Sequence, residues 1–171
     1  MGRSKAVPVL NALGLPLKIG LKHIRGSMLE SLFCLLEQIK KDAPGNVFTG
    51  TGIVIYEFLD NFPLLYLGES SEVQGEVDIL SSLLETSVAT NPNHDGFNMI
   101  DADMRLTHRN VYFSPPIDNR VSFDVTKGYG TRYAAAIMAS LVEGIKYTAV
   151  VSNSYGIVVF ETGKEIKRIN S

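Results

Sequence analysis

The sequence has few of the features that mark several large classes of protein. Cys34 is the only cysteine, so no disulfide can form within the chain, and this fits a reducing cytoplasm. Because Cys34 lies in an apolar run, we expect it to be a small buried hydrophobe. The 16 Lys and Arg against 18 Asp and Glu give a net charge of −2, without the basic excess of a nucleic-acid-binding surface. No apolar run reaches the ~20 residues that span a bilayer. We expect a cytoplasmic protein with no membrane span and no nucleic-acid partner.

Several common catalytic signatures are also missing. There is no Walker-type Gly-Lys-Ser/Thr, and Gly128-x-Gly130 lacks the third glycine of a dinucleotide fingerprint. No ordering of Ser, His and Asp, or of Cys and His, indicates a nucleophile system, and no Cys/His cluster suits zinc. The chain is nevertheless 171 residues long and 45% apolar. That is enough for one globular domain with a core that needs no disulfide or metal.

The first residues differ in character from the rest of the chain. Arg3 and Lys5 precede a mildly apolar segment, Val7–Leu21, that superficially resembles a signal peptide. Prolines and polar residues interrupt this segment, no small-residue cleavage site follows it, and the myristoylation pattern fails at its sixth position. We interpret residues 1–24 as an arm that packs on the domain or on a partner subunit, and residues 25–171 as the domain.

Helical and strand patterns interleave along the domain. Ser27, followed three residues later by Glu30, predicts a capping box at the start of a helix that runs to Lys41. Asp60–Pro63 predicts a hairpin-like turn between two strands. The expected fold is a single α/β domain with a mixed, mostly central β-sheet flanked by helices. We expect helices at 28–41, Val77–Ala89 and Arg132–Ile145, and strands at Val47–Phe58, Leu64–Leu67, Phe97–Ile100, Asn110–Phe113, Tyr147–Val151, Gly156–Phe160 and Glu165–Ile169.

Two glycines precede a Thr-Arg pair at the expected start of the third helix. Gly128 and Gly130 would let backbone amides approach a ligand closely, and these amides favour an anion together with the positive end of the helix dipole. Thr131 can add a hydroxyl, and Arg132 a planar fork that matches phosphate oxygens. The same spacing also suits a plain strand-to-helix turn with a solvated arginine, so both interpretations stay open.

His94-Asp95-Gly96 is a second candidate site. Asp before Gly is among the commonest turn pairs, which makes an ordinary turn the default interpretation. The alternative is that Asp95 binds a metal or orients a hydroxyl group, with His94 as a further candidate ligand for the same metal. The acidic pair Asp101 and Asp103 is expected to lie on a hairpin turn.

Taken together, these segments resemble the diadenylate cyclase domain, the catalytic module of enzymes that make cyclic di-AMP. The resemblance covers about residues 50–169 and preserves the order and spacing of four landmarks. The family has His-Asp-Gly-Ala, a Leu-Pro-containing strand end, Gly-Thr-Arg-His-Arg-Ala-Ala and Val-Val-Ser-Glu-Glu-Thr-Gly. The corresponding segments here are His94-Asp95-Gly96-Phe97, Phe113-Ser114-Pro115-Pro116-Ile117, Gly130-Thr131-Arg132-Tyr133-Ala134-Ala135-Ala136 and Val150-Val151-Ser152-Asn153-Ser154-Tyr155-Gly156.

The resemblance implies that residues 25–171 form a diadenylate cyclase-like domain that binds ATP or a related adenine nucleotide. Two facing domains of a homo-oligomer would each hold one ATP, and each 3′-hydroxyl would attack the other α-phosphate with release of pyrophosphate. Asp95 and Gly96 would be the catalytic residues, and Mn²⁺ or Mg²⁺ would bind Asp95, with His94 as a further candidate ligand. The residues implied in phosphate binding are Gly130, Thr131, Arg132 and Ser152.

The chain also departs from the family pattern. Tyr133 and Ala134 replace the His-Arg that follows the conserved arginine, and Asn153 and Ser154 replace the paired acids of the last motif. Losing one charged partner in such a site can cost ~3–4 kcal/mol of transition-state stabilisation. Three hypotheses therefore stand: an active diadenylate cyclase, a nucleotide-binding sensor on the same fold that has lost catalysis, and a purely structural α/β domain.

Overall fold

The computed structural model describes residues 27–60, 62, 64–68 and 71–170, so the expected N-terminal arm, residues 1–24, lies outside the described residues. No helix in these ranges is long and apolar enough to cross a membrane. The helices are α1 (Met28–Asp42), α2 (Ile79–Glu85) and α3 (Thr131–Ala139), with short 3₁₀ turns at Gly45–Val47 and Val125–Lys127. The strands are β1 (Thr51–Tyr56), β2 (Leu64–Tyr66), β3 (Phe97–Asp101), β4 (Leu106–Phe113), β5 (Ile145–Ser152), β6 (Gly156–Glu161) and β7 (Lys164–Ile169).

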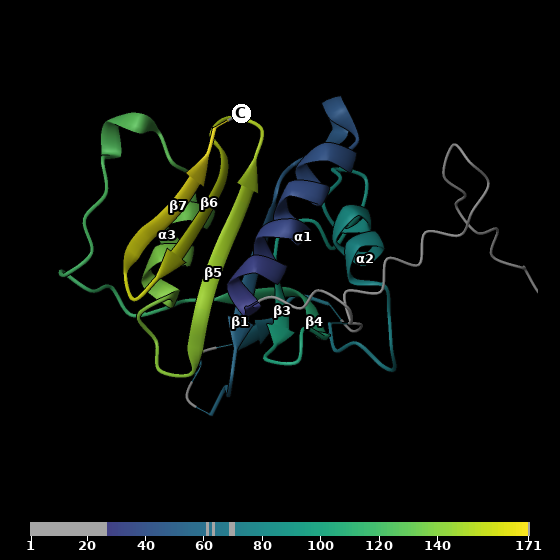
Figure 1. Cartoon of the computed structure of the whole chain (residues 1–171), viewed down its shortest axis with the longest axis horizontal. Helices are drawn as coiled ribbons and strands as arrows, with labels where there is room; N and C mark the ends of the chain where they lie inside the picture. The colour runs from purple at the N-terminus through teal and green to yellow at the C-terminus, as the bar shows by residue number, and fades with distance from the viewer. Residues whose placement is uncertain (1–26, 61, 63, 69–70, 171) are drawn as a thin grey trace, which may run out of the picture.

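These strands form one sheet in the order β2-β4-β3-β1-β5-β6-β7 (Figure 1). β1 runs parallel to β3, with Val54 opposite Met99, and antiparallel to β5, with Val54 opposite Thr148. The remaining neighbouring strands are also antiparallel. The expected α/β fold with a mixed, mostly central sheet is therefore confirmed.

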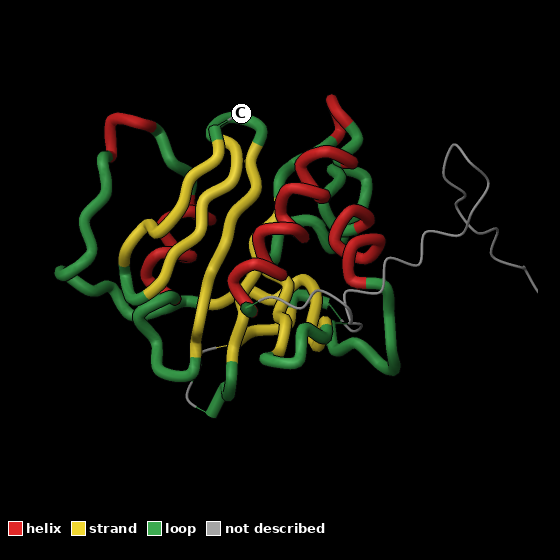
Figure 2. Tube along the Cα trace, viewed as in Figure 1, coloured by secondary structure: helices red, strands yellow, loops and turns green. Residues whose placement is uncertain are grey.

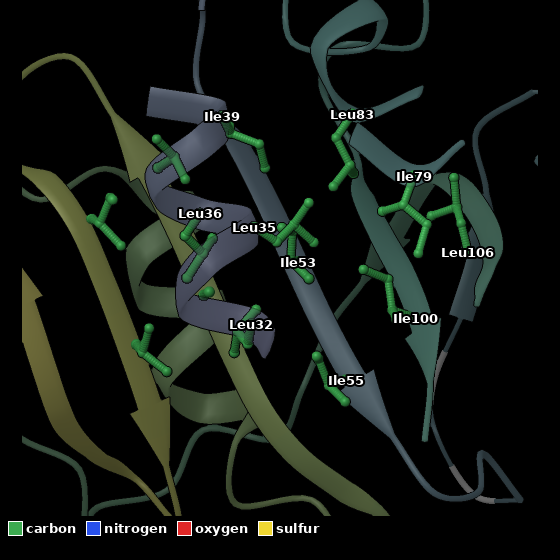
Figure 3. Packing of buried hydrophobic residues seen from close by; sticks show 14 of the residues in the cluster. Leu32, Leu35, Leu36, Ile39, Ile53, Ile55, Ile79, Leu83, Ile100 and Leu106 are labelled. Atoms are coloured by element: carbon green, nitrogen blue, oxygen red, sulfur yellow. The ribbon is translucent and has the colours of Figure 1, made fainter. Parts of the chain in front are cut away.

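Helices cover both faces of the sheet, and each face has its own apolar core. α1 and α2 lie together on one face, and α3 lies on the other (Figures 1 and 2). Because side chains alternate along a strand, Ile53 and Ile55 of β1 pack in the α1 core, whereas Val54 packs in the α3 core. The helix side chains in the α1 core include Leu32, Leu35, Leu36 and Ile39 of α1 and Ile79 and Leu83 of α2 (Figure 3).

α1 begins with the predicted capping box. The Glu30 backbone N–H donates to Ser27 Oγ (3.3 Å), and the Ser27 N–H donates to Glu30 Oε2 (2.6 Å). The prediction that Cys34 is buried is wrong, because Cys34 is exposed. Cys34 lies on the side of α1 opposite to the apolar stripe that faces the sheet. Its neighbours in the sequence are apolar, but its position around the helix leaves it exposed. The stripe consists of Leu32, Leu35, Leu36 and Ile39.

Three predicted elements are longer than the observed ones. β1 begins at Thr51 rather than Val47, after a 3₁₀ turn and Gly50, whose positive φ of 88° interrupts the extended backbone. α2 ends at Glu85 because the hydroxyl of Thr86, its C-cap residue, donates to the Ser82 carbonyl (3.0 Å). α3 ends at Ala139 instead of Ile145, which is already the first residue of β5.

β1 and β2 do not form the predicted hairpin with each other, and Asn61 and Pro63 of the predicted turn lie outside the described residues. β2 pairs with β4, with Leu65 opposite Tyr112, and lies at the edge of the sheet. Both sides of β1 are already occupied by β3 and β5, so the strand that follows it has to pair elsewhere. By contrast, Asp101 and Asp103 lie on the β3–β4 turn as expected, where both form ion pairs with Arg105.

Candidate functional site

Arg132 connects the two motifs that the sequence places far apart. It follows Thr131, the first residue of α3, and its guanidinium reaches the loops that enter β1 and β3. Nη2 donates to the backbone carbonyls of His94 (3.0 Å) and Asp95 (3.3 Å), and Nη1 donates to the Thr49 carbonyl (3.3 Å). The Thr-Arg segment and the His-Asp-Gly turn therefore belong to one site, at one end of the sheet.

The charge of Arg132 has no hydrogen-bonded counter-ion among the described residues, because the guanidinium donates to three backbone carbonyls there. Burial lowers the pKa of the guanidinium, and the nearby Tyr155 and Asp95 only partly oppose that effect. Gly130 is the N-cap of α3 and offers no side chain to cap it, and the first turn contains no acidic residue. A partly buried cation next to an uncapped helix N-terminus favours an anionic ligand.

Gly50 allows this close arrangement, although no pattern in the sequence singles it out. Its φ is +88°, and a Cβ at this position would lie 2.6 Å from the Val151 carbonyl oxygen and 3.2 Å from Arg132 Nη1. A side chain would therefore separate β5 from the entry to β1 and push the guanidinium away. The only sequence signal is a glycine before a strand, which is too common to identify a site.

His94 and Asp95 form a pair at the surface of the site. His94 Nδ1 lies 2.6 Å from the Asn91 carbonyl, which can only accept, so Nδ1 carries the proton. Nε2 then faces Asp95 Oδ1 at 3.1 Å. In the protonated ring Nε2 carries a second proton and forms an ion pair with the carboxylate. In the neutral ring Nε2 has a free lone pair. The side chains of His94 and Asp95 are 26% and 76% exposed, so a ligand can reach both atoms.

These two atoms fit a divalent cation as a partial ligand set. One carboxylate and one imidazole nitrogen can bind Mn²⁺, and Mg²⁺ commonly takes one or two carboxylates and completes its shell with water and substrate phosphates. Among the described residues, no group of three or more His, Cys, Asp or Glu could hold a metal ion by itself. A metal at this turn would therefore need phosphate oxygens as further ligands.

Gly96 has a clear structural role in this turn. A Cβ there would lie 2.4 Å from the Asn110 backbone carbon, so only glycine lets the start of β3 approach β4 this closely. The Gly96 N–H donates to Asn110 Oδ1 (3.1 Å), and Asn110 Nδ2 donates to Asn93 Oδ1 (3.0 Å). Asn110 itself has a φ of +51°. Its side chain therefore holds both ends of the His94-Asp95 turn.

Asn110 is a site residue that sequence reasoning missed. The β3–β4 register shifts where Phe97 lies opposite Val111 but Met99 lies opposite His108, and Asn110 lies in this irregularity. Asparagine tolerates the left-handed backbone better than most residues. No spacing in the sequence indicates the shift, because it depends on how the two strands pair.

The turn between β5 and β6 forms another side of the site. Ser152 Oγ lies 2.9 Å from Ser154 Oγ and accepts from the Ser154 N–H (3.2 Å). Burial raises the pKa of Tyr155, and the charge of Arg132 and a hydrogen bond with Ser152 both oppose this rise. Asn153 Nδ2 donates to the Phe48 carbonyl (3.0 Å). Ser152 therefore connects to Arg132 through Tyr155, while Asn153 fixes the loop before β1.

Tyr133 does not join Arg132 at the site. Its ring is stacked on Tyr129, with centroids 4.1 Å apart and planes at 13°, and its hydroxyl donates to Glu165 Oε2 of β7 (3.2 Å). Burial is the main reason that its pKa is raised to about 12, and Glu165 adds to the effect. Tyr133 therefore ties α3 to β7.

The chain thus has a mixed α/β fold with an anion-favouring helix N-terminus beside a His-Asp turn. No family model matches the sequence, and no curated protein is significantly similar to it. Among solved structures, it is similar to a double mutant of DacA from Staphylococcus aureus, with a TM-score of 0.57 and 22% identity over 82% of this chain and 90% of that one.

It is also similar to a hypothetical membrane spanning protein from Bacillus cereus, with a TM-score of 0.61 and 18% identity. That match covers 85% of this chain and 64% of the other, so the chain spans less than two thirds of that protein. At these identities the likeness establishes the fold alone. The predicted diadenylate cyclase-like fold is confirmed, while the roles predicted for Asp95, Gly96, Gly130, Thr131, Arg132 and Ser152 remain predictions.

Proposed function

We propose that this protein binds ATP and condenses two ATP molecules into cyclic di-AMP with release of two pyrophosphates. The observation that carries the proposal is the position of the Arg132 guanidinium at the N-terminus of α3, against the backbone of His94 and Asp95. It combines an anion-binding feature and a hydroxyl-orienting carboxylate in one place, as the proposed reaction requires. The DacA-like fold supports the same conclusion.

Each residue of the site has a proposed task. Arg132, Thr131 and the first amides of α3 hold the phosphates, and Gly130 keeps the approach to those amides open. The Ser152 hydroxyl, which shares a hydrogen bond with Tyr155, is proposed as a further contact to the same ligand. Positioning and charge neutralisation account for most of the catalysis in such transfers.

Asp95 orients the 3′-hydroxyl of one ATP, and that oxygen forms a bond to the α-phosphorus of the other. The bond from this phosphorus to the bridging oxygen breaks, pyrophosphate leaves with that oxygen, and the Asp95 carboxylate accepts the proton of the attacking hydroxyl. Asp95 and His94 would hold Mn²⁺ or Mg²⁺, which would supply charge neutralisation for the phosphates. The reaction needs two sites face to face, so we propose that the active form contains at least two copies of the chain.

The second candidate is a nucleotide sensor without turnover. It is favoured by the replaced positions, because Tyr133 bonds to Glu165 and Asn153 bonds to the Phe48 carbonyl, and neither adds charge to the site. Such a protein would keep the phosphate-binding role of Arg132 and would have lost catalytic groups. The two candidates therefore agree on binding and differ only in product.

The deciding experiment is an incubation of the purified full chain with ATP and either Mn²⁺ or Mg²⁺, analysed by mass spectrometry for cyclic di-AMP. Nucleotide binding is measured in parallel by calorimetry. Cyclic di-AMP that depends on the metal supports the cyclase. Binding without product supports the sensor, and the absence of both would overturn the assignment of a nucleotide site.

A further inference from the structure

A second concave surface lies against α3 and shares no lining residue with the Arg132 site. We call it the β7 groove. It is lined by the loop that precedes α3, by α3 itself and by β7. Its volume is about 460 Å³, within the range of pockets that bind small organic molecules. Nothing in the proposed cyclase reaction uses it.

One wall of the β7 groove is aromatic and firmly held. Tyr129 and Tyr133 are stacked, and the ring of Phe123 meets Tyr133 edge-on with centroids 5.6 Å apart. The guanidinium of Arg168 lies 4.9 Å from the Tyr129 centroid and is fixed by Glu165, which accepts from Arg168 Nε at 2.8 Å. Tyr133 itself is only 3% exposed, so the partly exposed Phe123 and Tyr129 present the apolar surface of this wall at fixed positions, which suits the organic part of a ligand.

Two of the four cations that line the β7 groove form no ion pair among the described residues, although the charge of Lys127 helps to lower the pKa of Asp124 and of Glu165. Arg120 is paired with Asp118, and Arg168 is paired with Glu165. Lys127 and Lys164 line the same groove, and neither has a carboxylate within ion-pair distance among the residues that the structure describes.

The remaining acid in the groove is Asp124, which accepts hydrogen bonds from the N–H and hydroxyl of Thr126 at 3.0 Å and 2.6 Å. Counted with Asp118, the groove carries four cations and three carboxylates, a net charge of +1, although the chain carries −2. An anion is therefore favoured here against the overall charge of the protein.

We propose that the β7 groove binds a phosphorylated organic molecule of nucleotide size, with Lys127 and Lys164 contacting the phosphate and Phe123 and Tyr129 contacting the organic part. The volume exceeds the need of a bare phosphate, and the aromatic wall lies beside the two lysines. Because Tyr129 and Tyr133 flank Arg132 in sequence, a bound ligand would also contact the beginning of α3. The proposal does not depend on cyclase activity.

The test is a titration of the ¹⁵N-labelled full chain with AMP, with inorganic phosphate as the reference ligand, followed by NMR. We expect saturable shifts at Gly163 and Tyr129, with higher affinity for AMP than for phosphate. Lys127→Ala combined with Lys164→Ala should weaken AMP binding at these resonances about tenfold or more, as losing contacts to a charged group does. The matched control, Lys41→Ala with Lys146→Ala, changes the charge equally and should leave the affinity unchanged.

The outcomes separate this groove from the Arg132 site. Shifts confined to Gly50 and Ser152 would overturn the proposal that the β7 groove binds a ligand. They would leave the proposed function standing. Equal losses in the two double variants, or equal affinities for AMP and phosphate, would also overturn it. The titration is repeated with Arg132→Ala, and the shifts at Gly163 should persist in this variant. Loss of nucleotide binding at the Arg132 site would therefore not prevent detection of AMP binding in the β7 groove.

Discussion

Arg132 holds its site together through bonds to the backbone rather than to other side chains. Its three carbonyl partners lie in two loops that are separated by more than forty residues in the sequence. Removing the side chain therefore takes away both the proposed phosphate contact and a brace between the loops. Binding and stability have to be measured separately to tell the two effects apart.

We expect Arg132→Ala to weaken ATP binding by about 1.5–3 kcal/mol, because a hydrogen-bonded contact to a charged group is lost. Calorimetry measures the affinity, and thermal unfolding reports the loss of the brace. The control is Arg105→Ala, which removes an exposed guanidinium from the β3–β4 turn and should leave ATP affinity unchanged. Equal affinity in wild type and Arg132→Ala would place the phosphates elsewhere.

Asp95→Asn tests the proposed catalytic carboxylate with little change in shape. The backbone carbonyl that Arg132 uses is kept, so the variant should fold normally and still bind ATP. We expect cyclic di-AMP to disappear in the mass-spectrometric assay, because the group that orients the hydroxyl has lost its charge. Asp103→Asn is a matched control, since the side chains of Asp103 and Asp95 are 75% and 76% exposed. Retained turnover in Asp95→Asn would rule out the assigned role.

At the scale of elements, the His94-Asp95 turn depends on how β3 meets β4. The shift in their register gives Asn110 its left-handed backbone, and Asn110 bonds to Gly96 and Asn93 on either side of the turn. The turn is therefore pre-organised by a strand irregularity. This explains why Gly96 matters although it contributes no reactive group.

Gly96→Ala should destabilise the fold by about 1–3 kcal/mol, the usual cost of overpacking, because the new Cβ would meet Asn110 backbone atoms. Chemical denaturation measures the change. The comparison is Gly130→Ser, where a Cβ would meet nothing within 4 Å and serine suits the N-cap of α3, so stability should hold. Equal stability of Gly96→Ala and wild type would contradict the close approach of β3 and β4.

A second link between elements joins α3 to β7 through Tyr133 and Glu165. Tyr133 is almost fully buried, and its pKa is raised to about 12 from an ordinary value of 10.0. A raised pKa means that the folded state favours the neutral phenol. The stability that this provides is complete below pH 10 and is lost as the pH rises from about 10 to about 12.

The stability of the wild type should therefore fall in alkaline solution, as measured by denaturation at a series of pH values. Tyr133→Phe should be less stable near neutral pH, because Glu165 loses a hydrogen bond, and its decline above pH 10 should be shallower. Tyr147 and Tyr155, whose pKa values burial also raises, keep part of the decline. Tyr112→Phe, at an exposed position, is the control and should follow the wild type. Identical alkaline slopes for Tyr133→Phe and the wild type would contradict this assignment.

At the scale of the whole molecule, the proposed reaction is incomplete in one copy of the chain. The fold is similar to that of DacA, and the Arg132 site contains one set of the proposed phosphate-binding groups. Joining two nucleotides through two phosphodiester bonds requires that two such sites meet. Association of the chain is thus part of the proposed mechanism rather than a separate property.

We therefore expect the rate of cyclic di-AMP formation per protein molecule to fall on dilution, whereas ATP binding per site should not change. The rate is measured over a hundredfold range of protein concentration, with sedimentation or light scattering at the same concentrations. If the rate per molecule stays constant while the protein is monomeric, the requirement for two facing sites is wrong.

The sequence alone determined the fold class and most element positions, because hydrophobic periodicity and end signals act locally. The capping box of Ser27 and Glu30 placed the start of α1, and Thr131 was correctly expected at the opening of α3. The sequence alone did not determine which strands pair. The turn at residues 60–63 looked like a hairpin, yet β2 pairs with β4, since β1 has both its edges filled by strands from later in the chain.

For the candidate site, the sequence supplied the candidate residues, and the tertiary structure supplied their relations. Spacing could indicate Asp95 and Arg132 as separate candidates, because turn and helix-start signals are short-range. It could not show that the guanidinium of Arg132 reaches the carbonyl of Asp95, or that Asn110 and Gly50 make this possible. Those contacts join loops that only the folding of the sheet brings together, so local patterns carry no information about them.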